Sequence, residues 1–84
     1  MNKSIYTAQQ TVLRSLLKEV RLEAHLRQVD LAERLDEPQS FVSKYEAGER
    51  RLDLIELRHV CEAIGIPLRV LVDRFERGLN ETER

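Results

Sequence analysis

The sequence has few of the residues that interrupt helices or form covalent cross-links. Glycine occurs three times and proline twice in 84 residues, so few positions force a helix to end. Cys61 is the single cysteine, which excludes an internal disulfide and is typical of a reducing compartment. Tryptophan is absent, and two phenylalanines and two tyrosines leave a mostly aliphatic core. No apolar run resembles a signal peptide or is long enough to span a bilayer, so we expect a cytoplasmic location and no membrane contact.

The charges of the chain are nearly balanced. It carries 14 basic and 15 acidic residues, and the net charge of -1 argues against a broad phosphate-binding surface. Between residues 9 and 51 there are eight basic and eight acidic side chains. Any surface that binds phosphate must therefore be a local patch, with few contacts and a weak dependence of affinity on salt.

The length and the apolar fraction fit one small helical domain with one core. Apolar residues make up 42% of the chain and charged residues 35%, a composition unlike that of a disordered segment. We expect the domain to cover residues 9–77. A partly flexible arm over residues 1–8 should precede it, and a frayed polar tail over residues 78–84 should follow it.

Apolar residues at helical spacing predict five helices and no strand. The first helix should cover residues 8–24 and begin at a capping box formed by Thr7 and Gln10. The second should cover residues 28–35 and end before Pro38, which lacks an amide hydrogen and restricts the residue before it.

Three further helices complete the expected fold. One covers residues 39–47 and ends where Gly48 adopts a left-handed backbone. The next begins at Asp53, the first residue of a second capping box, and ends at Gly65. The last has Pro67 in its first turn.

The third predicted helix has one side made of amides, hydroxyls and a lysine. This side consists of Gln39, Ser40, Ser43 and Lys44, whereas Val42 and Tyr45 should pack beneath. It is either the solvated face of an amphipathic helix or a surface that forms hydrogen bonds with a flat partner. Two short helices joined by a tight turn, the second with an exposed polar face, are the layout of a helix-turn-helix.

Two stretches carry a resemblance to a known family. Residues 28–35 read QVDLAERL, with glutamine first and alanine in the middle. Residues 38–48 read PQSFVSKYEAG, with valine inside the helix and an ending of an aromatic residue, Glu, any residue and Gly. This pattern resembles the Cro/C1 (Xre-type) repressor family over roughly residues 9–76. The resemblance implies an all-α, five-helix, lambda-repressor-like DNA-binding domain, with the helix-turn-helix at its second and third helices.

The resemblance also implies particular contacts inside the domain. Ala32 should let the second and third helices cross closely, and Val42 and Tyr45 should pack under the third. Arg21 and Glu46 match a family ion pair that ties the first helix to the end of the third.

Three positions depart from the family pattern. Asp36 stands where the turn usually has glycine, and aspartate tolerates a left-handed backbone better than most residues. Arg27 replaces a common threonine or asparagine cap and is a candidate phosphate contact. Pro38 occupies the cap position of the third helix, which should start without a side-chain cap.

The partner that the resemblance implies is double-stranded DNA, with the third helix in the major groove. Gln39 has the amide geometry to contact adenine, and Lys44 reaches guanine one turn later. Ser40 and Ser43 complete the predicted base-reading set. Each good bidentate contact would discriminate between bases by about 1–3 kcal/mol.

Contacts with the DNA backbone are expected around the edges of this helix. The predicted residues are Gln28, Arg27, Phe41, Arg50 and Arg51. Phe41 either covers the edge of the core or packs on a sugar and a thymine methyl, and we favour partial burial. Arg14 and Lys18 are expected to be ordinary solvated charges.

Family members lengthen their site by binding palindromic DNA as dimers, with half-sites about 34 Å apart. We expect a homodimer through the fifth helix, with Val70, Leu71 and Phe75 at the interface. The alternative is that Leu68, Leu71 and Phe75 only close the core of the monomer.

Catalysis and metal binding receive no support from the residues. His25, His59 and Cys61 lack the company of a metal site, and no set of nucleophile, acid–base and orienting groups occurs. We therefore expect no enzyme, no cofactor and no metal. The sequence predicts a sequence-specific transcription regulator that acts as a repressor. The alternatives are an antitoxin paired with a toxin, a restriction-modification controller, or an adaptor that binds another regulator and no longer binds DNA.

Overall fold

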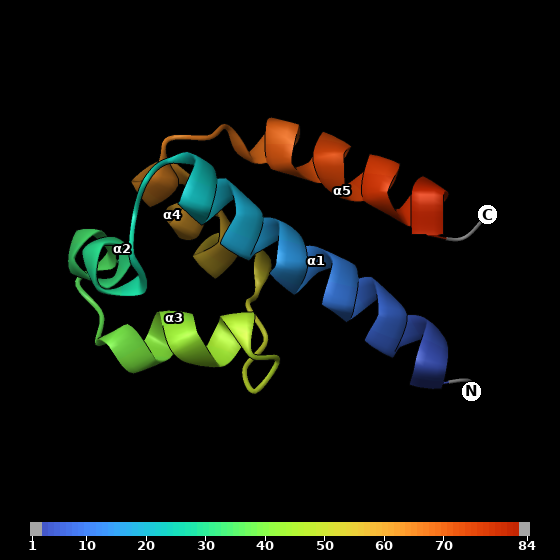
Figure 1. Ribbon diagram of the computed structural model, residues 1–84, viewed down its shortest axis with the longest axis horizontal. Coiled ribbons are helices and arrows are strands. Elements are labelled where there is room, and N and C mark those ends of the chain that lie inside the picture. The colour runs from blue at the N-terminus through green and yellow to red at the C-terminus, as the bar shows by residue number, and fades with distance from the viewer. Residues whose placement is uncertain (1–2, 83–84) are drawn as a thin grey trace.

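The fold is an array of five helices with a helix-turn-helix at one end (Figure 1). The computed structural model describes the backbone of residues 3–82 and the side chains of residues 7–81. The helices are α1 Lys3–Glu23, α2 Gln28–Leu35, α3 Gln39–Glu46, α4 Leu54–Ile64 and α5 Leu68–Thr82. No strand occurs within residues 3–82, so the predicted all-α class with five helices is confirmed.

The arrangement leaves one side of α3 open. α2 packs on both α3 and α4, and α1 lies between α3 and α5 (Figure 1). The short turn from α2 to α3 brings the two helices together as a helix-turn-helix. Since α1 and α2 cover the inner side of α3, its outer side faces solvent.

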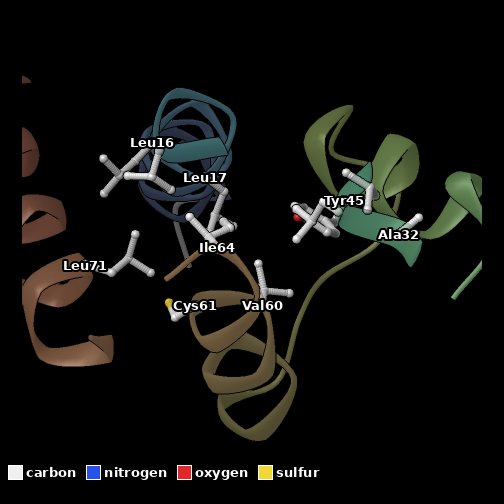
Figure 2. Close-up of a cluster of buried hydrophobic side chains, with 11 residues drawn as sticks. Leu16, Leu17, Ala32, Tyr45, Val60, Cys61, Ile64 and Leu71 are labelled. Carbon is white, nitrogen blue, oxygen red and sulfur yellow. The ribbon is translucent and has the colours of Figure 1, made fainter. Parts of the chain in front are cut away.

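The core takes one apolar stripe from each helix (Figure 2). Leu31, Val42 and Val60 are fully buried, and Ala32 lies where α2 crosses α3. Burying each large aliphatic side chain contributes about 1.5–3 kcal/mol. One polar atom of this core, the Tyr45 hydroxyl, is buried without a hydrogen-bond partner among the described residues. Burial raises the pKa of this phenol above its ordinary value.

Two helices end in left-handed residues that are not glycine. Asp36 has a φ of 56°, and the Glu37 amide donates to the Ala32 carbonyl at 3.0 Å. His25 has a φ of 60°, and the Leu26 amide donates to the Arg21 carbonyl at 3.2 Å. Both ends therefore follow the Schellman pattern, in which the left-handed position is normally glycine. The sequence pointed to Asp36 but not to His25.

The end of α3 uses the expected glycine. Gly48 has a φ of 83°, and the Glu49 amide donates to the Lys44 carbonyl at 2.8 Å. The helix ends at Glu46, with Ala47 as its cap residue. At α4 the predicted capping box is present, because the Asp53 carboxylate accepts from the Glu56 amide at 2.8 Å.

The two long helices extend further than predicted. α1 begins at Lys3 rather than at residue 8, so Thr7 does not cap it and instead offers its carbonyl to the Thr11 hydroxyl at 2.9 Å. No glycine or proline between residues 3 and 8 interrupts it. α5 continues through Gly78 to Thr82. A Cβ at residue 78 would lie 3.1 Å from the Val12 side chain. The flexibility of the arm stays a prediction, and residues 1, 2, 83 and 84 lie outside the described part.

Replacing Asp36 by glycine should stabilise the protein. Glycine removes the steric cost of the left-handed conformation, about 1–2 kcal/mol for an ordinary residue. The greater freedom of glycine in the unfolded chain offsets part of this gain. We expect a net gain of roughly 0.5–1 kcal/mol and a rise in Tm of about 2–8 °C in thermal unfolding followed by circular dichroism.

Glu33→Gly is the matched control for this substitution. Glu33 is exposed inside α2, where glycine should lower stability by about 1 kcal/mol. Equal losses in Asp36→Gly and Glu33→Gly would show that the left-handed turn carries no strain.

Candidate nucleic-acid interface

The outer face of α3 carries all four side chains predicted to read bases. Gln39, Ser40, Ser43 and Lys44 are exposed. On the opposite side, Val42 is 0% exposed and Tyr45 is 2% exposed. α3 begins after Pro38 without a side-chain cap, as expected from the sequence. The helix is thus held firmly from beneath, and its polar face is open to a partner.

A chain of side-chain hydrogen bonds leads from this face into the core. The Gln39 amide nitrogen lies 3.4 Å from Gln28 Oε1, and Gln28 Nε2 donates to Glu46 Oε1 at 3.2 Å. Glu46 in turn accepts from the Arg21 guanidinium. Arg21 Nη1 donates to the Leu26 carbonyl at 2.8 Å. The first residue of α2 therefore links the first residue of α3 to a buried ion pair.

That ion pair joins α1 to the last turn of α3. Arg21 Nε and Nη2 donate to the two Glu46 carboxylate oxygens at 2.8 and 2.9 Å. The side chains are 6% and 4% exposed, so water hardly reaches them. The hydrogen bonds with Glu46 raise the pKa of Arg21 further above its ordinary value. This is the pair that the family resemblance implied.

The start of α2 holds a second, exposed ion pair. Arg27 Nε and Nη2 donate to the Asp30 carboxylate at 3.0 and 2.9 Å, and the Arg27 amide donates to it at 2.8 Å. These bonds lower the pKa of Asp30 to about 2. Asp30 therefore caps the helix from its third position. Arg27, a predicted phosphate contact, already has a carboxylate partner that sequence reasoning missed.

Arg50 also has partners inside the protein. Its guanidinium lies 4.7 Å from the centre of the Phe41 ring and donates to the Glu56 carboxylate. Phe41 is half-buried and meets Tyr45 edge-on, with 5.6 Å between ring centres. The structure thus places Phe41 at the edge of the core. Nothing in the sequence pointed to Glu56 as the partner of Arg50.

Arg51 and Lys44 differ from Arg27 and Arg50. Both are exposed, and neither has a carboxylate partner within residues 7–81. Of the predicted contacts around α3, these two cations are the ones whose charge is not offset internally.

Comparison with known proteins places this geometry in a family. The helix-turn-helix family model HTH_3 matches residues 17–71, which include α2, α3 and α4. The chain belongs to the Cro/C1-type (XRE) helix-turn-helix family. Membership of the XRE family supports a DNA-binding regulator.

Two solved structures illustrate the relationship. An XRE-family-like protein from Pseudomonas syringae pv. tomato str. DC3000 is 45% identical, with a TM-score of 0.84 over 89% of this chain and 92% of that one. The restriction-modification controller protein C.Esp1396I is 20% identical, with a TM-score of 0.79 over 84% of this chain and 91% of that one. This second likeness shows a shared fold alone. No curated protein gave a match.

The apolar residues that are exposed on α5 differ from those expected at the dimer interface. Leu71 is 1% exposed and belongs to the monomer core, so it has no surface to offer a partner. Val70 and Val72 are 40% and 42% exposed and lie on opposite flanks of Leu71, because two residues span about 200° of a helix. Phe75 is half-buried.

The described residues contain neither a candidate metal site nor a helix that could span a membrane. No group of three or more histidine, cysteine or acidic side chains among them is placed to hold a metal ion. None of the described helices combines the length and the apolar character needed to cross a bilayer.

Removing one partner of the buried ion pair should destabilise the protein more than replacing both partners by apolar residues. Glu46→Gln leaves the Arg21 charge buried without a counterion, which costs about 3–5 kcal/mol. Arg21→Met combined with Glu46→Leu removes both charges and should be less destabilising than Glu46→Gln alone. Urea unfolding of these proteins measures the difference, with Arg21→Met and Glu46→Leu as the single variants that complete the cycle. Strictly additive losses would show that the two charges do not interact.

Proposed function

We propose that the protein is a sequence-specific transcription regulator that represses by occupying DNA through α3. One observation carries the proposal. The exposed polar face of α3 is rigidly backed by the core and is tied, through Gln28, to the buried pair of Arg21 and Glu46. A merely solvated helix face would not need such support.

The hydrogen bond between Gln39 and Gln28 suits base reading. An amide nitrogen carries two hydrogens, so Gln39 can donate one to Gln28 and one to adenine N7. Its oxygen then accepts from adenine N6, which completes the bidentate pair. Lys44 follows Ser40 by about one turn on the exposed side of α3, where its amine would reach guanine O6 and N7. Ser40 and Ser43 lie beside them and add donors and acceptors.

The electrostatics support a modest backbone contribution. Asp30 offsets the charge of Arg27, and Glu56 offsets that of Arg50. Few cations therefore remain to release counterions from DNA. These internal pairs support the weak salt dependence expected from the sequence.

A dimer of two copies of the chain could bind a palindromic DNA site. α5 presents a partly exposed apolar strip formed by Leu68, Val72, Phe75 and Leu79. These residues share one side of the helix by their spacing. Val70 lies away from this strip, so we assign the dimer contact to Val72 and Phe75. Two α3 helices about 34 Å apart would then read half-sites one turn apart.

The alternative functions use the same fold. An antitoxin or a restriction-modification controller would also bind DNA through α3, with a toxin as the partner of the former. An adaptor that binds only protein is favoured by the acidic balance of the chain. The open face of α3 favours DNA. A cytoplasmic location and the absence of enzymatic activity remain predictions.

The base-reading residues provide the direct test. Duplexes selected by the protein from a random library are titrated by fluorescence anisotropy. Gln39→Ala and Lys44→Ala should each weaken binding about 5- to 100-fold and relax specificity at one position, because each removes one bidentate contact. Arg58→Ala, in an exposed pair with Glu62 on α4, is the control and should bind like the parent protein. Selection of no duplex, or full binding by the Gln39 and Lys44 variants, would reject this function.

The dimer is tested separately by sedimentation. Val72→Glu should give a monomer that binds a single half-site, because it places a charge in the apolar strip. Val70→Glu has almost the same exposure and should leave the dimer intact. Dissociation by Val70→Glu alone would place the interface on the other flank of α5.

A further inference from the structure

The first turn of α3 carries Gln39, the proposed adenine contact, and has little support of its own. The helix is eight residues long, and so short a helix is marginal in water without tertiary contacts. Pro38 precedes it and provides no side-chain cap. The bond from Gln39 Nε2 to Gln28 Oε1 is 3.4 Å, which is long for a hydrogen bond. A fixed position for Gln39 therefore depends on other contacts of this turn.

The loop that follows α3 supplies one such contact by folding back along the helix. Gly48 has a φ of 83°, and the Glu49 amide donates to the Lys44 carbonyl at 2.8 Å, so the chain reverses there. The Arg50 guanidinium then lies over the ring of Phe41, 4.7 Å from its centre. Since Phe41 belongs to the first turn of α3, the loop at the end of the helix supports its beginning.

The Arg50 side chain is itself held by two hydrogen bonds. Nη2 donates to Glu56 Oε2, and Nη1 donates to the Arg51 carbonyl at 3.1 Å. The other oxygen of Glu56 accepts from the Asp53 amide at 3.0 Å, within the capping box of α4. A guanidinium can make both bonds and still cover a ring, because its donors lie in one rigid plane. Arg50 thus joins the first turn of α3 to the first turn of α4.

Phe41 has space beside it into which its ring could move. The residue is half-buried and borders a pocket of about 530 Å³ between α2, α3 and α4. Leu35, Val60 and Glu56 are among the other residues that line this pocket. Tyr45 meets the ring edge-on at 5.6 Å, and Arg50 lies over it. These two contacts oppose a movement of Phe41 that would displace the first turn of α3.

The charges around Arg50 suit a role inside the protein. The hydrogen bond with Glu56 raises the pKa of Arg50 above its ordinary value, and the nearby carboxylates of Glu37 and Asp53 raise it further. A DNA phosphate that approached this guanidinium would also meet these carboxylates. The surroundings of Arg50 therefore favour an internal role over the backbone contact expected from the sequence.

We propose that Arg50 is a positioning residue, which holds the first turn of α3 through Phe41 and so sets the selectivity of Gln39 without contacting DNA. This rests on the proposed function, because it concerns how α3 distinguishes base pairs. A phosphate contact would act differently. It would strengthen binding to every duplex by the same factor and would add to the salt dependence.

The test measures discrimination between two duplexes by fluorescence anisotropy. One is the selected duplex, and the other has a change at the base pair where Gln39→Ala relaxes specificity. Arg50→Lys keeps the charge but loses the planar fork, so the ratio of the two Kd values should fall about 2- to 30-fold. Arg50→Gln should lower the ratio at least as much, and neither variant should change the slope of log Kd against log salt. Arg58→Lys is the matched control, since Arg58 pairs with Glu62 on the surface of α4, and should keep the ratio.

The route through Phe41 is tested by a double-mutant cycle. Phe41→Leu should lower the ratio by itself, and adding Arg50→Lys to it should have little further effect. Additive effects of the two substitutions would overturn this route. A variant that is only less stable binds both duplexes less by the same factor, so a fall in the ratio is not a consequence of unfolding.

Two other results would overturn the role of Arg50 and leave the proposed function standing. One is an unchanged ratio in both Arg50 variants. The other is a slope that falls by about 1 in Arg50→Gln, with equal weakening of both duplexes and parental binding by Arg50→Lys, which is the behaviour of a phosphate contact. Failure of the parent protein to select any duplex would overturn the proposed function, and this role with it.

Discussion

The buried ion pair of Arg21 and Glu46 is the contact on which the rest of the structure depends. It fastens α1 to the last turn of α3, and through Gln28 it reaches the first residue of α3 as well. The Glu46 carboxylate, in the last turn of α3, is thus also linked through Gln28 to Gln39 at the start of the helix. A buried pair of this kind adds little net stability, because desolvation offsets the attraction. Its effect is to fix the position of α3, which is what a groove-reading helix requires.

Several of the other charges are also paired inside the protein. Arg27 pairs with Asp30, Arg50 with Glu56, and Arg74 with both Glu19 and Glu23. These pairs cap α2, hold the loop after α3 and join α1 to α5. The near-zero net charge therefore says little about the binding surface, because paired and unpaired cations count equally in it. The cations that matter for an anionic partner are those without a carboxylate, and among the described residues these include Lys44 on α3 and Arg51 in the loop that follows it.

The sequence predicted the features that depend on the spacing of neighbouring residues. It did not predict the features that a tertiary contact determines. The capping box at Asp53, the glycine end of α3 and the small Ala32 follow from neighbouring residues or from the family pattern. A frayed tail was expected from residue 78, but α5 continues through Gly78, where a Cβ would lie 3.1 Å from the Val12 side chain of α1. The face of α3 could be predicted from its residue types. The partners of Arg50 and Arg14 could not, since they come from positions 6 and 32 residues away that no periodicity connects. Arg27 and Asp30 are three residues apart, which is a helical spacing, but Arg27 was interpreted only as a phosphate contact.

The strained turn before α2 is held by Arg21, the same arginine that forms the buried ion pair. Arg21 binds Leu26 twice, accepting from its amide through the backbone and donating to its carbonyl from the guanidinium. These two bonds hold His25 in a left-handed conformation that its side chain does not favour. They also fix where the chain enters α2, and hence where Gln28 lies. The local strain at His25 is therefore a consequence of placing Gln28 against Glu46. A glycine at residue 25 would relieve this strain and keep both bonds between Arg21 and Leu26, because neither of them involves the His25 side chain.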